Sequence, residues 1–303
     1  MEFIKQLFGV GIVAGLVALT PMVLVGWILN RRRIKFKAAA LEPFTDLPLR
    51  PPGESLRLKI QDLNDEFDSH FTVAAMISLG ASAFAIALRP SSPGWGLTVS
   101  FLGFIVVAAW GWTLKQLWPL QKKLWDYRLG FTGERVVGEA LNQLLADGFL
   151  VFHDVPFEDH ATRAKFNLDH VIVGPPGVYV VETKTRRKPA ALSGNERATV
   201  MFDGEMLHFP TGSDSHGVKQ ASDNAATLSK WLSSSTGEPT PVQAILTLPG
   251  WWIERKSKGR VAVHNPKEIR YSFPTRVAEP LSQERIQRIA HQLTERCRLE
   301  KPV

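Results

Sequence analysis

The chain contains almost no cysteine. Cys297 is the only one among its 303 residues, which excludes an intrachain disulfide and a zinc cage of cysteine thiolates. The eight histidines include no His-Glu-x-x-His pair, the spacing typical of zinc hydrolases. The sequence also lacks a Gly-x-Ser-x-Gly nucleophile elbow and a phosphate-binding loop ending in Gly-Lys-Ser or Gly-Lys-Thr. Serine-hydrolase and ATP-driven functions therefore have no support.

Positive charge is in excess. Lys and Arg number 36 against 29 Asp and Glu, which gives a net charge of +7 and a pI of about 9.6. Such a balance favours anionic partners, either phospholipid or nucleic acid. The apolar share of 45% and the charged share of 21% exclude a disordered chain. The length suits about two domains of roughly 100–200 residues each.

Three segments without any charged residue predict transmembrane helices: Leu7–Leu29, Phe71–Leu88 and Trp95–Leu114. Each approaches or exceeds the roughly 20 residues that a helix needs to cross the hydrocarbon core. A cleaved signal peptide is an alternative for the first, although Arg31 to Arg33 follow it where a small-residue cleavage site would stand. A buried helix pair of a soluble domain is an alternative for the other two, which lack the polar stripe of such helices.

Most of the basic residues that flank these segments fall on one side of the predicted membrane. Clusters lie at Arg31–Lys37 and Lys115–Arg128, whereas the loop between the second and third segments carries only Arg89. Because basic flanks stay in the cytoplasm, we expect the amino terminus outside and the C-terminal domain cytoplasmic, in a multi-pass protein of the inner or plasma membrane. The predicted domains are transmembrane helix 1 at 1–30, a cytosolic connector at 31–70, a transmembrane helical hairpin at 71–118 and an α/β domain at 125–303.

A β-hairpin is predicted within this last domain. The β-branched runs Asp169–Gly174 and Gly177–Lys184 are joined by Pro175-Pro176. Symmetric pairing about the turn gives facing residue numbers that sum to 351, so that Asp169 faces Glu182. Strand alternation then places Lys184 on the face of Glu182.

Two carboxylates and an amine are thus expected at one end of the hairpin. Facing Cβ atoms lie about 4.5–5.5 Å apart, so the two carboxylates would repel unless a cation lay between them. Their hard oxygen ligands suit Mg²⁺ or Mn²⁺. The alternative is that Asp169, Glu182 and Lys184 form a salt-bridge cluster on a sheet edge. A helix is also predicted from Glu134 to Asp147, closed by Gly148. Glu134 shares its apolar stripe, although a glutamate at a helix start usually lies exposed there.

These residues carry a family resemblance. Gly133-Glu134, the stretch from Leu168 to Lys184 and Lys219-Gln220 resemble the nuclease-related domain (NERD) family, which belongs to the PD-(D/E)xK, restriction-endonuclease-like nucleases. The resemblance covers about residues 130–250, and its Asp-His…Glu-x-Lys part is the most specific. It implies an α/β fold with a restriction-endonuclease-like core, a mixed sheet flanked by helices, here preceded by three transmembrane helices.

The resemblance also implies roles for single residues. It makes Asp169 and Glu182 metal ligands and Lys184 the catalytic lysine. Glu134 would be the helix carboxylate that completes the catalytic site, and Gln220 a candidate supporting residue. Mg²⁺, or Mn²⁺, would be the cofactor.

Two basic stretches could hold the phosphate backbone of a nucleic acid. The candidate residues are Arg186, Arg187, Lys188, Arg255, Lys256 and Lys258. Trp251-Trp252, beside the second stretch, could stack on bases. Alternatively, these stretches are solvated loops or a surface that faces anionic lipid.

The sequence therefore predicts a membrane-anchored, Mg²⁺-dependent nuclease that hydrolyses phosphodiester bonds, and we favour DNA over RNA as its partner. The alternative is a catalytically inactive module that keeps the nuclease fold and serves nucleic-acid binding or membrane scaffolding. Endo versus exo action and the oligomeric state stay open.

Overall fold

The computed structural model describes residues 48–88, 93–158, 164–191, 194, 196–273 and 279–298. The chain divides into two compact units, one formed by residues 1–45 and 61–125 and the other by residues 46–60 and 126–303. The predicted first transmembrane helix, at 1–30, lies outside the described residues.

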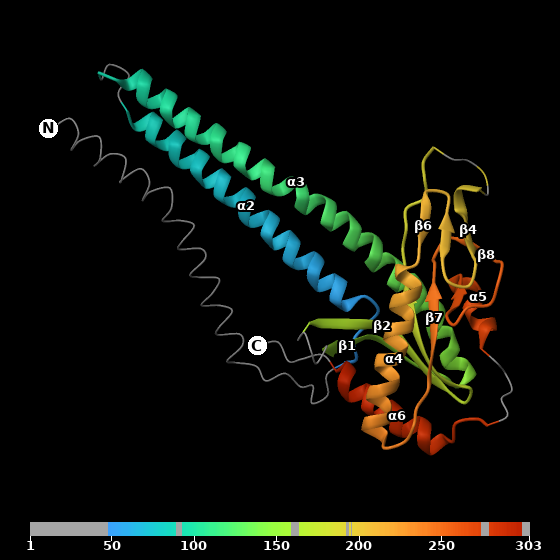
Figure 1. Cartoon of the computed structure of the whole chain (residues 1–303). Helices are drawn as coiled ribbons and strands as arrows, with labels where there is room; N and C mark the ends of the chain where they lie inside the picture. The colour runs from blue at the N-terminus through green and yellow to red at the C-terminus, as the bar shows by residue number, and fades with distance from the viewer. Residues whose placement is uncertain are drawn as a thin grey trace, which may run out of the picture. The chain divides into compact units, whose positions relative to one another are not determined.

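The first unit contains a helical hairpin. Its helices belong to α2 (Glu54–Ala87) and α3 (Trp95–Asn142), which lie side by side in Figure 1. The indole Nε1 of Trp110 donates a hydrogen bond of 2.9 Å to Ser78 Oγ, and the Trp110 ring meets Phe71 edge-on at 5.4 Å. These contacts join the two apolar runs.

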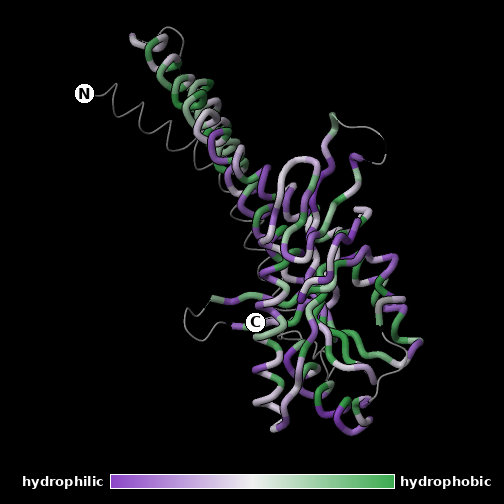
Figure 2. The backbone as a smooth tube through the Cα atoms, turned by 45° about the vertical axis from the view of Figure 1, so that its right-hand side comes forward, coloured by the Kyte–Doolittle hydropathy of each residue, from purple (hydrophilic) through white to green (hydrophobic). Residues whose placement is uncertain are grey.

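The outer surface of this hairpin is apolar, as the green colour of its helices in Figure 2 shows. Ile86 is 85% exposed, Leu97 80% and Phe104 69%. By length and composition, α2 and the helical segment Trp95–Asp147 each qualify as a candidate membrane span. The apolar parts that would span are Phe71–Leu88 and Trp95–Leu114, so Glu134 lies outside them.

Helix α3 corrects one sequence expectation. A separate helix was predicted to start at Glu134, yet α3 continues through this position to Asn142. The physical reason lies in the charged stretch after Leu114, whose Lys, Gln, Leu and Arg residues are good helix formers. Glu134 is therefore an interior helix residue, and its backbone N–H is not part of a helix end.

The second unit is built on a mixed five-stranded sheet in the order β1-β2-β3-β7-β9. Strands β1, β2 and β3 pair antiparallel, whereas β3, β7 and β9 run parallel. Both faces of the parallel part are covered, which explains why its strands read as continuous apolar runs. The strands are β1 (Leu150–Glu158), β2 (Lys165–Gly174), β3 (Gly177–Thr183), β7 (Val242–Thr247) and β9 (Ala262–His264).

Helices cover both faces of this sheet. On one face, α4 (His216–Thr236) packs on β3 and β7, and α6 (Gln283–Cys297) packs on β1 and β2, through apolar side chains such as Leu228 and Ile289. On the other face, the end of α3 packs through Val137 and Leu141, together with η1 (Gln143–Asp147), α5 (Pro266–Ile269) and η3 (Arg270–Ser272). The mixed sheet flanked by helices is the expected α/β arrangement.

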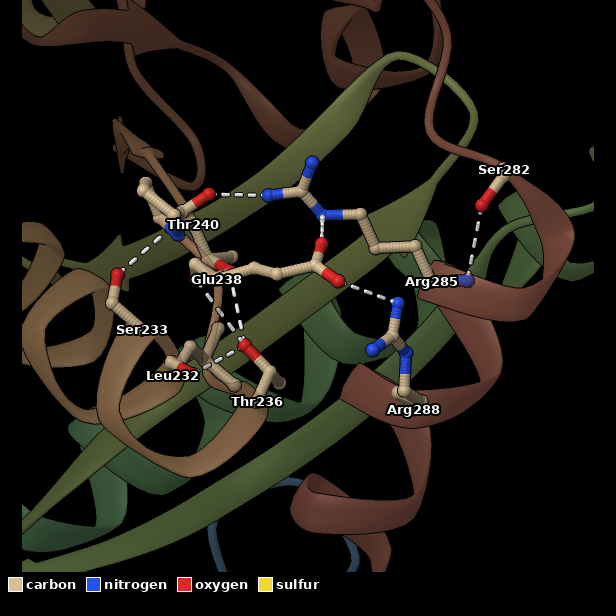
Figure 3. A network of polar contacts seen from close by, with 9 residues as sticks. Leu232, Ser233, Thr236, Glu238, Thr240, Ser282, Arg285 and Arg288 are labelled. Carbon is tan, nitrogen blue, oxygen red and sulfur yellow. Dashed lines mark hydrogen bonds and ion pairs between the residues drawn. The ribbon is translucent and has the colours of Figure 1, made fainter.

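An ion-pair network links α4 to α6 (Figure 3). Glu238, just beyond the end of α4, lies 2.7 Å from Arg288 and 3.5 Å from Arg285 on α6. Ser282 caps α6 by accepting a hydrogen bond from Arg285 N at 3.2 Å. This network fixes α6 against the end of α4.

A second sheet, of four short strands in the order β6-β5-β4-β8, was not predicted. Its strands are β4 (Thr199–Phe202), β5 (Leu207–Phe209), β6 (Gly212–Asp214) and β8 (Trp252–Arg255), and η2 (Glu196–Ala198) precedes them. Trp251 is only 1% exposed and packs on Phe209. The expectation that Trp251 stacks on bases is therefore wrong, because its ring belongs to the core.

Candidate active site

The hairpin of β2 and β3 has the predicted register. Gly174 pairs with Gly177 and Val173 with Val178, so facing residue numbers sum to 351 as expected. The pairing continues to His170 and Val181, and Asp169 is the next residue along β2. Gly177 has φ +140°, which favours glycine at this turn. The turn therefore brings Asp169 and Glu182 to the same end of the two strands.

Glu182 is held from two sides. It is 2% exposed, with Oε1 2.9 Å from Lys184 Nζ and with Oε2 accepting a hydrogen bond of 2.8 Å from Asn224 Nδ2. Lys184 Nζ also donates to Gln220 Oε1 at 2.8 Å. Burial raises the pKa of the Glu182 carboxyl, and the nearby Lys184 ammonium opposes this rise. Helix α4 thus supplies Gln220 and Asn224 as partners of the Glu-x-Lys pair, and sequence reasoning missed Asn224.

Asp169 lies beside this pair. Its Oδ2 accepts a hydrogen bond of 2.7 Å from the backbone N–H of Thr183. Burial raises the pKa of the Asp169 carboxyl well above its usual range, and the negative charges of Glu182 and Glu134 raise it further. The carboxyl groups are therefore close enough to repel one another, as the sequence predicts.

Glu134 reaches the same cluster from α3. Burial raises the pKa of its carboxyl to about 8, with further contributions from the charges of Asp154 and Glu182, while Lys59 and Lys184 oppose the rise. The structure thus brings together all four predicted catalytic residues, Glu134, Asp169, Glu182 and Lys184. Glu134 is half-buried, so the alternative of a fully exposed glutamate does not describe it.

The turn before α2 forms one side of the site, which the sequence did not predict. Gly53 has φ +77°, and a Cβ at this position would lie 3.7 Å from Glu134 Oε2 and 2.7 Å from the Phe131 ring. One turn further along α3, a Cβ on Gly138 would lie 2.5 Å from the ring of Pro52. The chain ahead of α2 therefore packs directly on the part of α3 that carries Glu134. The Pro51-Pro52-Gly53 sequence was the available signal for a turn there.

Asp154 on β1 anchors this turn. Its carboxylate lies 2.5 Å from Arg50 Nη2, and it accepts hydrogen bonds from the Ser55 hydroxyl at 2.5 Å and the Asn167 amide at 2.9 Å. Asp154 is 2% exposed and has φ +50°, so the strand backbone adopts an unusual conformation where this network forms. The network connects residues about a hundred positions apart in the chain.

A chain of hydrogen bonds lies behind the carboxyl groups. His170 follows Asp169 on β2 and so points to the opposite face of the sheet, where its Nδ1 lies 2.9 Å from Nδ1 of His153. Burial lowers the pKa of His153 to about 4 and the pKa of His170 well below its usual value, so both rings are neutral near pH 7. His153 Nε2 faces the Asn142 Oδ1 acceptor at 3.0 Å, and His170 Nε2 lies 3.4 Å from Thr183 Oγ1.

These contacts fix the protons of the chain. His153 must donate from Nε2 to Asn142, so its Nδ1 accepts from Nδ1–H of His170. His170 Nε2 then accepts the hydroxyl proton of Thr183, whose backbone N–H donates to Asp169. The histidine pair thereby supports the strand end that holds Asp169.

The donor set suits a small divalent cation. In the part of the chain that the structure describes, no group of three His, Cys, Asp or Glu side chains is arranged to hold a metal ion. Mg²⁺, however, is commonly bound through one or two carboxylates, with waters and substrate phosphates completing the shell. Asp169 and Glu182 supply two such groups. Burial raises the pKa of both carboxyls, and a bound cation would favour their ionised form.

Most of the predicted nucleic-acid-binding residues have partners within the protein. Arg187 lies 2.6 Å from Asp126, Arg255 2.5 Å from Glu268, and Lys256 3.3 Å from Glu254. Arg186 lies over the Phe209 ring at 4.3 Å and 3.9 Å from Asp214. Lys188 and Lys258 are exposed, and Lys258 borders a groove of about 1020 Å³. These two keep the charge most accessible to a phosphate.

Comparison with known proteins gives one match. The family model described as "Nuclease-related domain" matches residues 129–249. This region contains Glu134, Asp169, Glu182, Lys184 and Gln220, which are the residues that the structure brings together. No curated protein and no solved structure matches the chain significantly.

Proposed function

We propose that the protein is a membrane-anchored, metal-dependent nuclease that hydrolyses phosphodiester bonds, with DNA favoured over RNA, and that its mixed sheet is a restriction-endonuclease-like core. The observation that carries this proposal is the convergence of Glu134, Asp169, Glu182 and Lys184 within the nuclease-related region. Three carboxyl groups with raised pKa values lie beside one ammonium group. Folding does not need such a cluster, and clusters of this kind are typical of functional sites.

The residues would share the chemistry as follows. Mg²⁺ or Mn²⁺ bound to Asp169 and Glu182 would lower the pKa of a bound water and neutralise charge on the phosphate. Lys184, which Glu182 and Gln220 hold in place, would orient the attacking water and stabilise the developing negative charge. Glu134, with a pKa of about 8, can accept or donate a proton near neutral pH.

The membrane part would place this chemistry at the cytoplasmic face of an inner or plasma membrane. Support comes from the two candidate spans and from the basic residues that flank them. Anchoring would confine the nuclease to nucleic acid that comes close to the membrane.

A second candidate function is nucleic-acid binding without catalysis. It is favoured by the mutual pairing of Glu182, Lys184, Gln220 and Asn224, which satisfies both Glu182 oxygens without a metal ion. In this case the protein would bind nucleic acid equally well with and without a divalent cation.

A cleavage assay separates the two candidates. The purified full chain in detergent is incubated with plasmid and with labelled DNA and RNA oligonucleotides, in Mg²⁺, Mn²⁺ or a chelator. We expect ion-dependent cleavage, which Asp169→Asn or Glu182→Gln reduces by roughly 100-fold or more. Glu139→Gln is the matched control, because Glu139 is an exposed residue of α3.

Cleavage that survives both Asp169→Ala and Glu182→Ala would reject the proposed site. Binding without cleavage under every ionic condition would instead establish the second candidate.

A further inference from the structure

An apolar pocket of about 420 Å³ opens in the second unit next to the candidate active site. Its walls come from Val136 on α3, from the turn of Pro249 to Trp252 after β7, and from the start of α5 at Pro266. Trp252 is 65% exposed there, whereas its neighbour Trp251 belongs to the core. The volume lies within the roughly 300–1,000 Å³ of small-ligand sites.

One wall of the pocket, at Pro249, lies beside the end of the central strands. The backbone N–H of Lys184 donates to Thr247 O at 2.9 Å, so β3 and β7 end together. Thr185 and Pro249, the residues that follow, both pack on Gly133: a Cβ at Gly133 would lie 2.0 Å from Thr185 Cγ2 and 3.6 Å from Pro249 Cγ. The pocket wall therefore touches the residue that precedes Glu134.

A basic segment leads from Lys184 to the rim of the pocket. Arg186 O accepts a hydrogen bond of 3.3 Å from the Trp251 indole, and Lys188 Nζ lies 4.0 Å from the position that a Cβ on Gly250 would take. Lys188 follows Lys184 by four positions in the chain, a span of at most about 14 Å. Lys188 is exposed, and within the described ranges no ion pair engages it, so its charge faces solvent at the rim.

We propose that this pocket binds one unpaired nucleobase of the substrate, stacked on Trp252, while Lys188 contacts a phosphate of the same strand. The inference rests on the proposed function and specifies its substrate class. Apolar walls and an exposed indole suit the π-face of a base, and the lysine suits the backbone that continues toward Lys184. A base inside an intact duplex is unavailable for such stacking, so the substrate is single-stranded or locally unpaired nucleic acid.

Binding is tested first, separately from cleavage. The full chain carrying Asp169→Asn is titrated, in detergent, with a single-stranded oligonucleotide that contains 2-aminopurine, whose fluorescence falls on stacking. Adding Trp252→Ala should weaken binding about tenfold and remove the quenching, whereas Trp252→Phe should keep most of both. Tyr271→Ala is the matched control, since Tyr271 is an 85% exposed aromatic residue of the same unit that does not line the pocket.

Cleavage then places the base relative to the cut. Oligonucleotides with a single abasic position are compared with the intact strand in wild-type protein. We expect kcat/KM to fall about tenfold for an abasic site at one fixed distance from the cut, and this dependence to vanish in Trp252→Ala. An intact duplex of the same sequence should react more slowly.

The outcomes are distinguishable. Quenching and Trp252-dependent binding without any cleavage would support the pocket and refute the proposed catalysis. Cleavage and binding that Trp252→Ala leaves unchanged would overturn the pocket and leave the nuclease in place. The Trp252→Ala variant is also tested for binding to anionic vesicles. If the substitution weakened vesicle binding and left oligonucleotide binding unchanged, the base-binding pocket would be overturned in favour of a lipid-facing surface.

Discussion

Glu134 illustrates how a single side chain responds to its surroundings. Its carboxyl has a pKa of about 8 in the folded protein against 4.5 for an ordinary glutamate. A group of this kind binds more protons in the folded than in the unfolded state between these two pH values. Its contribution to stability is therefore complete below about pH 4.5 and is lost as the pH rises through about 8.

We expect the metal-free protein to lose stability relative to Glu134→Gln between pH 5.5 and 8.5, by about 1–2 kcal/mol because partial exposure screens the charges. Thermal unfolding in a chelator, followed by near-UV circular dichroism at each pH, measures the difference. Added Mg²⁺ should reduce this difference in stability between the wild type and Glu134→Gln. Glu139→Gln should behave as wild type, and equal pH dependence of wild type and Glu134→Gln would contradict the assigned environment.

Asn224 offers a test of the pairing around Glu182. Asn224→Ala leaves a buried carboxyl oxygen without its donor, which costs about 1–3 kcal/mol. The unfolding midpoint should fall by roughly 2–10 °C for a unit of this size. Ser222→Ala, at an exposed position of α4, is the control and should leave the midpoint near the wild-type value.

At the scale of elements, the turn ahead of α2 packs on the region that matches the family model, although that match begins only at residue 129. Lys59 Nζ lies 5.9 Å from the centre of the Tyr127 ring, so α2 and α3 adjoin where they enter the second unit. A fragment that starts at residue 125 lacks Gly53 and the Arg50 partner of Asp154. A shortened protein in which a short linker joins residue 60 to residue 126 would retain both Gly53 and Arg50.

Gly53→Ala tests whether this turn supports catalysis. The added Cβ would collide with the Phe131 ring and shift the turn away from Glu134, so we expect kcat/KM for cleavage to fall at least about tenfold. Gly237→Ala is the matched control, because Gly237 has a similar φ of +74° with open space around it. Both variants should lose about 1–2 kcal/mol from the left-handed backbone. Equal kcat/KM in the two would show that the turn has no catalytic role.

The elements that the sequence predicted well have strong local signals. The hairpin register followed from Pro175-Pro176 and the alternation of its strands. The grouping of Asp169, Glu182 and Lys184 followed from the same register together with the family resemblance.

The elements that escaped prediction lack such signals. Strands β4, β5, β6 and β8 have only three or four residues each, too few to show a period. The burial of Trp251 depends on this unpredicted sheet. The contact of Arg50 with Asp154 joins distant parts of the chain, which no local pattern encodes. Glu134 was placed on the correct stripe but at a helix start, because the continuity of α3 is not visible from residues 134–147 alone.

For the whole molecule, orientation in the membrane is the property to test. We expect a reporter that works only in the cytosol to be active when fused after Val303 and inactive when inserted in the loop at Arg89. The basic residues Lys115, Lys122 and Lys123 should hold this orientation. Replacing them with Gln, with lysines added beside Arg89, should invert the hairpin in a measurable fraction of molecules, whereas lysine additions near Lys37 should not.

Retention of the full chain in membranes after an alkaline wash checks that it spans rather than adheres. A reporter at Val303 that is active only outside the cytosol would reverse the proposed orientation. Release of the chain by the wash would instead support the alternative that the apolar hairpin is a helix pair of a soluble domain.

The histidine pair behind the site also determines where protons can travel. Each ring is neutral with both nitrogens engaged, and the chain of bonds ends at the amide of Asn142, which cannot carry a proton onward. The histidine pair therefore fixes the strand that carries Asp169 without acting as a proton relay, so the protons that the carboxyl groups exchange near neutral pH do not travel along it.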